Sequence, residues 1–478
     1  MTKIAMIGAG SQIFSKTLAM DIMATEALQD CEIRLMSPTE FKLKRVECFL
    51  QDVVEMNNLS TRIWSTIDRR KALEGADFVI IMVQVGGVEA FARDYEIPMK
   101  YGIDQCIGDS LGPGGIFRGL RTIPVLLDIA QDIMELCPNA TLLNYSNPMA
   151  ANCLALGKAI PELKFVGLCH GVQTTLDLIS RYVDVPKENI DYTCAGINHM
   201  AWFLKLNDKV SGKDLYPEFM ANIEKPEYYV NEKVRCEVAR NFGYFMTEST
   251  GHLSEYVPWF RKNAEALELY CDQPGFGGAS GAYYHYCSEL AGKFKEIDYL
   301  KFEDKQLSPR SVEYCSYIIE AIATGKPFEF NGNVRNDGYI SNLPDGCCVE
   351  VPVTVDATGL HPQKIGNLPS QCCALNMSNV IVQQLATEAA IDGDPEKAVQ
   401  ALSLDPLTAA VLHPAEIRQL AIEMFQAEAK WLPQFAGKKP IAKPVIKIPD
   451  DLTAIEVPVD PALAIANRFE KLAEMNVR

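Results

Sequence analysis

The feature that most constrains the fold is an alternation of short apolar runs and longer amphipathic segments in the first part of the chain. Apolar runs of about 4–8 residues between turn residues are typical of buried strands, and segments with helical periodicity are typical of covering helices. This alternation predicts an α/β protein with a doubly wound parallel sheet, in which ligands bind beyond the carboxyl ends of the strands. The expected strands are residues 3–8, 32–36, 78–83, 140–143 and 165–167, and the expected helices are a segment ending near residue 28 and residues 118–136.

The pattern loosens after residue 194 into a mixture of long helical segments and few strands. We therefore expect a dinucleotide-binding domain over residues 1–195 and an α+β domain for substrate binding and oligomerisation over 196–435. Residues 436–478 would form a Lys- and Pro-rich linker (437–449) and a terminal helix (461–475) of unknown role. The second domain is expected to hold helices at 227–245, 312–324, 377–391 and 414–430 and a strand at 349–355.

Composition excludes several classes of protein. The formal net charge is −17, from 62 acidic and 45 basic residues, so the chain lacks the basic surface that nucleic acids and anionic membranes need. No apolar stretch approaches the roughly 20 residues that span a bilayer. The sequence opens directly on an apolar run that is too short for a secretion signal, and its 15 cysteines show no regular spacing. We therefore expect a cytoplasmic protein with reduced thiols.

A glycine-rich turn follows the first expected strand. In the sequence Gly8-Ala9-Gly10-Ser11, residues Gly8, Gly10 and Ser11 would let backbone amides approach a pyrophosphate, as in a Rossmann-like domain. The third glycine of the usual fingerprint is replaced by Ile13, and no acidic residue follows the second strand, where Ser37 could bind the ribose instead. The pattern favours NAD over NADP, although a tight turn without a ligand would look the same.

Three polar segments lie within an apolar frame: 143–149, 167–173 and 194–200. We expect each to follow a strand of the doubly wound parallel sheet, so that their polar side chains meet at one crevice. Cys169 and His199 would then offer a thiolate and an imidazole to a transition metal. Each residue alone has a simpler explanation, since a cysteine is commonly a small buried apolar residue and a single histidine is commonly part of the core.

Eight motifs follow one another along the chain. They are Gly8-Ala9-Gly10-Ser11, Gly112-Pro113-Gly114-Gly115, Asn144-Tyr145-Ser146-Asn147-Pro148, Cys169-His170-Gly171-Val172, Gly196-Ile197-Asn198-His199, Glu255-Tyr256-Val257-Pro258-Trp259-Phe260, Asn333-Val334-Arg335-Asn336-Asp337-Gly338 and Gly346-Cys347-Cys348-Val349-Glu350-Val351. In this order they resemble glycoside hydrolase family 4, and most closely its α-galactosidase (melibiase) branch. The resemblance extends from Lys3 to about Phe435.

The resemblance implies an unusual glycosidase mechanism that does not use a pair of carboxylates. NAD takes a hydride from C3 of the sugar, and the resulting ketone acidifies the proton at C2. A base removes this proton, the glycosidic oxygen leaves C1 by elimination, water adds to C1, and the hydride returns to C3. A divalent metal polarises the ketone and stabilises the enediolate.

The resemblance also implies roles for individual residues. Cys169 and His199 match the metal ligands, with Mn²⁺ as the expected ion, and Tyr256 matches the base. His170 would be the acid for the leaving group or a ligand of a sugar hydroxyl. The remaining candidates are Gln84, which would contact NAD, and three residues that would line the sugar pocket, Asn147, Asp109 and Arg335, although a solvated salt bridge explains the last two as well.

The choice of sugar stays open at this point. The α-galactosidase branch usually carries Ser where this chain has Gly171, and the missing side chain would leave a looser pocket for glucosides or uronides. The substrate is thus expected to be a small α-glycoside, and relatives imply a homodimer or homotetramer. Two other classes are considered: a 2-hydroxyacid dehydrogenase, which needs no thiolate-bound metal, and an NAD-binding sensor without activity.

Overall fold

The computed structural model describes residues 1–458 and 460–475. It contains two compact units, Met1–Ala442 and Lys443–Arg478. Within the described part of the chain, no helix combines the length and the apolar character needed to cross a membrane.

One sheet of eleven strands organises the first unit. Six of its strands are parallel and lie in the order β3-β2-β1-β4-β5-β6, as expected for a doubly wound sheet. The inner strands are apolar because both faces are covered, and β1 and β4 are almost entirely buried. The parallel strands are β1 (Lys3–Ile7), β2 (Glu32–Met36), β3 (Arg62–Thr66), β4 (Phe78–Ile81), β5 (Thr141–Asn144) and β6 (Phe165–Gly167).

The sheet continues past β6 with antiparallel strands in the order β9-β10-β7-β8, and β11 pairs with β10. The pairs Gly167–Asn333, Asn333–Glu350 and Glu350–Gly196 form one row across β6, β9, β10 and β7. This row connects the strand before Cys169 with the strand before His199. The antiparallel strands are β7 (Ile190–Ile197), β8 (Met200–Asp208), β9 (Phe328–Arg335), β10 (Cys348–Asp356) and β11 (Gly359–Pro362).

Helices cover the sheet and extend beyond it. In the first half of the chain they are α1 (Phe14–Met23), α2 (Glu40–Met56), α3 (Arg69–Leu73), α4 (Gly87–Lys100), α5 (Gly112–Leu136), α6 (Met149–Ala159), α7 (Gly171–Val183), α8 (Tyr216–Ile223), α9 (Pro226–Tyr229) and α10 (Lys233–Phe242). In the second half they are α11 (Thr250–Tyr256), α12 (Ala264–Tyr270), α13 (Ala282–Glu296), α14 (Cys315–Thr324), α15 (Ser370–Asp392), α16 (Pro395–Leu404), α17 (Pro406–Val411), α18 (Pro414–Ala427) and α19 (Pro461–Met475).

Short 3₁₀ turns connect several of these elements. They are η1 (Glu26–Leu28), η2 (Lys187–Asn189), η3 (Gly275–Gly277), η4 (Tyr299–Phe302), η5 (Ala429–Trp431) and η6 (Pro433–Phe435).

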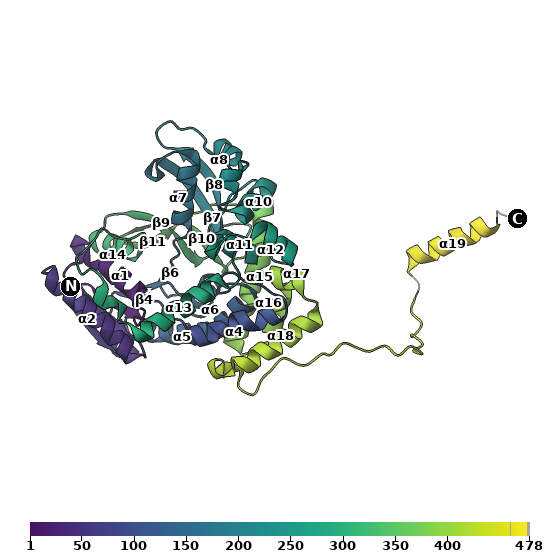
Figure 1. The fold of residues 1–478 in the computed structure, drawn as a ribbon, viewed down its shortest axis with the longest axis horizontal. Helices are drawn as coiled ribbons and strands as arrows, with labels where there is room; N and C mark the ends of the chain where they lie inside the picture. Colours follow the sequence, from purple (N-terminus) through teal and green to yellow (C-terminus); the bar gives the residue numbers. More distant parts are fainter. Residues whose placement is uncertain (459, 476–478) are drawn as a thin grey trace. The chain divides into compact units, whose positions relative to one another are not determined.

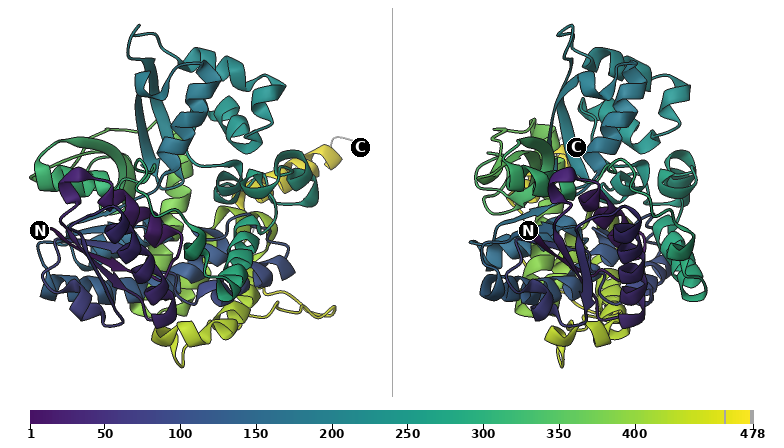
Figure 2. Two further views of the ribbon diagram at one scale, coloured as in Figure 1. Left: turned by 60° about the vertical axis from the view of Figure 1, so that its left-hand side comes forward. Right: turned by 90° about the vertical axis from the view of Figure 1, so that its left-hand side faces the viewer.

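The β7–β8 hairpin has a core of its own. Together with α7, α8 and α10 it projects from the parallel part of the sheet (Figures 1 and 2). Buried side chains of these elements, including Phe203, Phe219 and Phe245, form a cluster separate from the main core. The hairpin is therefore a rigid platform, and the turn at its end presents His199.

The predicted fold class is confirmed, and the differences from the expected elements have local causes. The helix expected at 118–136 begins earlier, at Gly112, because its glycines pack tightly: a Cβ on Gly115 would lie 2.3 Å from the Ser110 carbonyl carbon. The helix expected at 227–245 is divided into α9 and α10, since Glu232 leaves the helix and accepts a hydrogen bond from the Thr250 amide. β3 was not expected from the sequence because it is a polar, partly exposed edge strand.

The expected domain boundary at residue 195 lies inside β7, and the division into 1–195, 196–435 and 436–478 stays a prediction. In the second unit, α19 has the bounds expected for the terminal helix. The residues between Lys443 and α19 that the structure describes form no helix or strand, as expected for a linker.

Candidate active site

The glycine-rich turn lies directly after β1 and packs closely against the backbone that follows β4. Gly8 has φ +97°, and a Cβ at this position would lie 2.5 Å from the Met82 carbonyl oxygen. The amides of Gly8 and Ala9 donate to the Met36 carbonyl at 2.9 Å, which ties the turn to the end of β2. Only glycine fits the positive φ of Gly8 and its close contact with the Met82 carbonyl. A glycine turn at this edge of the sheet is the kind of cradle that binds a pyrophosphate in Rossmann-like domains.

The other candidate nucleotide contacts surround this turn. Ser37 is buried after β2, and a Cβ on Gly10 would lie 2.8 Å from its hydroxyl oxygen. The Ser11 hydroxyl accepts a hydrogen bond from the Phe14 amide at 3.3 Å, so it caps the first turn of α1. Gln84 is exposed in the segment after β4. The structure thus brings Gly8, Gly10, Ser37 and Gln84 to the carboxyl edge of the parallel strands.

Cys169 and His199 come together from two different parts of the sheet. Cys169 follows β6, as predicted. The expectation that His199 also follows a parallel strand is wrong, because it lies in the two-residue turn between the antiparallel strands β7 and β8. His199 has φ +64°, an uncommon conformation for a residue with a side chain, which here directs its ring into the site.

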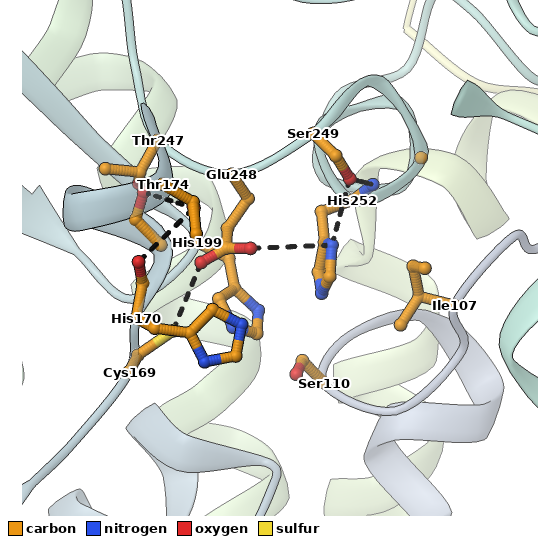
Figure 3. A network of polar contacts seen from close by, with 12 residues as sticks. Ile107, Ser110, Cys169, His170, Thr174, His199, Thr247, Glu248, Ser249 and His252 are labelled. Carbon is orange, nitrogen blue, oxygen red and sulfur yellow. Dashed lines mark hydrogen bonds and ion pairs between the residues drawn. The ribbon is translucent and has the colours of Figure 1, made fainter. Parts of the chain in front are cut away.

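Glu248 and His252 complete the cluster, and the sequence analysis missed both. The Cys169 thiol donates to Glu248 Oε1 at 3.1 Å, and Glu248 Oε2 lies 3.9 Å from Nδ1 of His252. Figure 3 shows the carboxylate of Glu248 between the thiol of Cys169 and the ring of His252. The rings of His199 and His252 pack edge to face with centroids 4.3 Å apart.

The donor atoms of this cluster are close enough to share one ion. Those of Cys169, His199 and Glu248 lie within 4.8 Å of one another, and so do those of Asp109, His199 and His252. Burial lowers the pKa of His199 to about 4, so its ring is neutral at physiological pH and available as a ligand. A sulfur, an imidazole nitrogen and carboxylate oxygens suit a divalent transition metal.

Tyr256 contacts one of these donors. Its hydroxyl oxygen lies 3.2 Å from Nδ1 of His199, at the end of α11. Burial, together with the charge of Asp109, raises the pKa of Tyr256 well above its ordinary value. The phenol therefore stays protonated in this environment, and it becomes a base only if a cation is bound beside it.

Asp109 and Asn147 form a second polar pair in the site. Asn147 donates to Asp109 Oδ2 at 2.8 Å, and the Ser110 hydroxyl donates to Oδ1 at 2.7 Å. Burial opposes ionisation of Asp109, but Arg118 and the nearby histidines lower its pKa, so it is a carboxylate. The pair presents a fixed amide and carboxylate of the kind that bind sugar hydroxyls.

His170 extends to the more open side of the cluster. Its Nδ1 lies 3.3 Å from Glu313, and this contact raises the pKa of His170. About half of its side chain is exposed, so it can reach a bound molecule. A protonated imidazole at this position is suited to donate a proton.

The space next to Gly171 is filled, contrary to the expectation of a looser pocket. A Cβ on Gly171 would lie 1.5 Å from Glu248 Oε1 and 2.5 Å from its carboxyl carbon. The carboxylate of Glu248 thus occupies the volume that a side chain at position 171 would take. The absence of a side chain at position 171 admits Glu248 and does not enlarge the pocket here.

Arg335 is not brought to this site. Its Nη1 donates to the Gly157 carbonyl at 2.8 Å, and its Nε lies 3.2 Å from Asp337. A Cβ on Gly157 would contact both Arg335 and Phe165, the first residue of β6, whereas Cys169 lies beyond the last. Arg335 therefore lies at the opposite end of β6, in the surface salt bridge considered as the alternative.

The residues that were missed do have a signal in the sequence. Glu248, His252 and Tyr256 follow one another at intervals of four residues, which places them on one face of a helix or its lead-in. The helix begins at Thr250, with the Ser249 side chain accepting from the His252 amide. Because Glu248 and His252 share a face of the helix or its lead-in with the candidate base Tyr256, their spacing indicates that they belong to the same cluster of metal-donor side chains.

Comparison with known proteins gives the family. The sequence pattern of the family 4 glycosyl hydrolases matches residues 3–185, and that of their C-terminal domain matches residues 194–408. The chain belongs to glycoside hydrolase family 4. It is 42% identical to an α-galactosidase from Rhizobium meliloti (strain 1021), over 92% of this chain and 91% of that protein. It is 39% identical to an α-galactosidase from Bacillus subtilis (strain 168), over 91% of this chain and 100% of that protein.

The same fold is also seen in a solved structure. A 6-phospho-α-glucosidase from gut microorganisms, in complex with NAD and Mn²⁺, superposes with a TM-score of 0.75 at 21% identity, covering 92% of this chain and 100% of the other. The resemblance found in the sequence and the assignment as a glycoside hydrolase are therefore confirmed. Membership in a glycoside hydrolase family replaces the two alternative interpretations, a 2-hydroxyacid dehydrogenase and an NAD-binding sensor without activity.

Proposed function

We propose that this family 4 enzyme is an NAD- and Mn²⁺-dependent exo-glycosidase that hydrolyses α-galactosides through oxidation at C3 and elimination across C1 and C2. The observation that carries the proposal is the placement of the Tyr256 hydroxyl 3.2 Å from His199, which shares a cluster of metal-donor atoms with Cys169. A base beside a metal ligand is what this reaction requires, because the proton at C2 is removed next to a ketone that the metal would polarise.

The residues of the chain fit both cofactors. The cradle at Gly8 and Gly10 and the buried Ser37 suit a dinucleotide at the carboxyl edge of the sheet, with Ser11 and Gln84 as further contacts. The fold neighbour from gut microorganisms carries NAD and Mn²⁺. When bound, NAD would accept and return a hydride at C3, and the metal would polarise the C3 oxygen and favour the ionised form of Tyr256.

The side chains of the chain then have distinct tasks. Tyr256 removes the proton from C2 of the sugar. His170, whose pKa is raised by Glu313, protonates the glycosidic oxygen as it leaves C1. Asn147 and Asp109 hold sugar hydroxyls and fix the ring against the base.

The choice of α-galactosides rests on the names of the two relatives at 42% and 39% identity. α-Glucosides and α-linked uronides are the second choice, because Gly171 departs from the serine of the α-galactosidase branch. All 15 cysteines of the chain are free thiols. This supports a reducing compartment, so we propose a cytoplasmic location, and the homodimer or homotetramer stays a prediction.

The proposal is tested with a panel of nitrophenyl α- and β-glycosides of galactose, glucose, galacturonic acid and glucuronic acid. Each is assayed with NAD, Mn²⁺ and a thiol reductant, and each additive is then omitted in turn. We expect release of nitrophenol from the α-galactoside, lost on omission of NAD or Mn²⁺, with no net formation of NADH. Hydrolysis that continues without NAD and in the presence of a chelator would contradict the proposal.

A further inference from the structure

The carboxylate of Glu248 occupies an unusual position. It lies in the volume left by Gly171, and its Oε1 accepts the hydrogen bond of the Cys169 thiol at 3.1 Å. Only 11% of its side chain is exposed. Nothing in the family resemblance assigns a role to this residue, and a buried acidic group requires a partner.

The backbone of Glu248 is strained in order to hold this position. Its φ is +144°, in a region that residues with a side chain rarely adopt. The cost of such a conformation is retained only where the surrounding structure or the function requires it. The strain therefore indicates that the place of the carboxylate matters more than local stability.

The contact between Glu248 and Cys169 depends on the proton of the thiol. In the present structure a proton holds Cys169 and Glu248 together, since the thiol donates to Oε1. A bound metal ion would be held by the thiolate form of Cys169, so the thiol proton would leave to solvent. A thiolate and a carboxylate at this distance repel each other unless a cation lies between them.

We propose that Glu248 is a third protein ligand of the metal, and that Gly171 is required because it leaves the space for the Glu248 carboxylate. The inference rests on the proposed function, in which Cys169 and His199 bind the ion. The donor atoms of the three residues lie within 4.8 Å of one another, which allows one ion to reach all of them. A carboxylate oxygen also suits Mn²⁺ better than sulfur does.

The alternative set of Asp109, His199 and His252 is less available to an ion. Both oxygens of Asp109 already accept hydrogen bonds, from Asn147 and from Ser110. Nδ1 of His252 lies 3.2 Å from the Ser249 hydroxyl. Glu248 Oε1, in contrast, accepts only from the Cys169 thiol among the residues that the structure describes, and this hydrogen bond would be released if Cys169 bound an ion as a thiolate.

A third protein ligand would also affect how the sugar binds to the metal. Three protein ligands leave fewer positions for the oxygens of the substrate than two ligands do. A side chain at position 171 would displace Glu248, so position 171 can influence the substrate through the coordination of the ion. This gives a physical reason for residues 171 and 248 to act together.

The test measures Mn²⁺ binding to the full-length protein without sugar, by electron paramagnetic resonance of free Mn²⁺. Wild type, Glu248→Gln, Gly171→Ser and the double variant are compared, with Glu47→Gln as a matched control at a buried carboxylate that binds Ser65. We expect Kd to rise by about 100-fold or more in Glu248→Gln, because loss of a residue that only supports a ligand already costs about 10–100-fold. Glu47→Gln should bind as wild type does.

The double variant decides whether the two positions act as one unit. Gly171→Ser should weaken binding to the level of Glu248→Gln, and the double variant should be no weaker than either single variant. Glu248→Gly, which relieves the strain, should bind Mn²⁺ weakly while the metal-free protein unfolds at the same or a higher temperature.

The outcomes separate this inference from the proposed function. If wild type binds Mn²⁺ and Glu248→Gln binds it equally well, Glu248 is not a ligand, and the inference is overturned while the proposed function stands. The same holds if the losses in Gly171→Ser and Glu248→Gln add up in the double variant. If wild type itself does not bind Mn²⁺, the proposed function fails.

Discussion

The two sides of the site are built differently. On the parallel side, after β1, β2 and β4, the chain offers backbone and small side chains around Gly8, Gly10 and Ser37. On the hairpin side, which also includes α11 and the segment that leads into it, the chain offers large reactive side chains: His199, Glu248 and Tyr256. The first side can hold a cofactor, and the second can do chemistry on a substrate.

The difference extends to backbone conformation. On the parallel side, positive φ falls on glycine, as at Gly8, where it costs little. On the hairpin side it falls on His199 and Glu248, which carry side chains. Strain is thus concentrated where the side chains must point in fixed directions. Substitutions on the two sides should therefore have different effects.

The largest effect is expected at the metal ligands. Cys169→Ser should lower kcat/KM by about 10³-fold or more, because Lewis-acid stabilisation contributes several kcal/mol to the transition state. Hydrolysis of nitrophenyl α-galactoside with saturating NAD and Mn²⁺ measures it. Cys137→Ser, at a buried thiol after α5, is the matched control and should keep its activity. Equal losses of kcat/KM in both variants would contradict the assignment of Cys169 as a metal ligand.

A loss of about 10²-fold or more in kcat is expected for Tyr256→Phe, since the variant lacks the general base. Its Mn²⁺ and NAD affinities should stay close to those of wild type. Tyr101→Phe, which removes a hydroxyl bonded to Glu423, should have wild-type activity. A Tyr256→Phe enzyme with full kcat would assign the base to another residue on the hairpin side.

On the parallel side the expected effect is smaller and concerns binding. Gly10→Ala places a Cβ 2.8 Å from the Ser37 hydroxyl, so either the Ser37 side chain or the turn must shift, at a cost of about 1–3 kcal/mol. We expect the Kd of NAD to rise by about tenfold with Mn²⁺ binding unchanged, as measured by calorimetry. Gly292→Ala, in α13 with open space at its Cβ, is the control. A change in Mn²⁺ affinity in Gly10→Ala would contradict the view that the parallel side binds the cofactor independently of the metal site.

The smallest effect is expected for removal of residues 443–478. The backbone is tied to the first unit up to Ile441, whose amide donates to Glu396 and whose carbonyl accepts from Arg418. Beyond it, Val445, Ile446 and Ile448 are largely exposed. The shortened protein should have the same unfolding temperature and kcat/KM as the full chain, by calorimetry and the nitrophenyl assay. A clear fall in either would give the terminal helix a role.

The two sides of the site also differ in how closely the sequence predicts them. The parallel side was predicted closely, because buried strands such as β1 and β4 are continuous apolar runs and Gly8 stands directly after one of them. The hairpin side was not, because β7 and β8 bring His199 to Cys169 through antiparallel pairing that no local pattern indicates. Resemblance alone named Tyr256, and it also named Arg335, which the structure holds at the other end of β6.

The measurement that tests the account most directly is hydrolysis of the α-galactoside in heavy water, followed by nuclear magnetic resonance of the released sugar. If Tyr256 takes the proton from C2 during cleavage, solvent deuterium replaces it when the ring is restored, and the product carries deuterium at C2. A product that keeps hydrogen at C2 throughout full conversion would contradict the account, whatever its cofactor requirement.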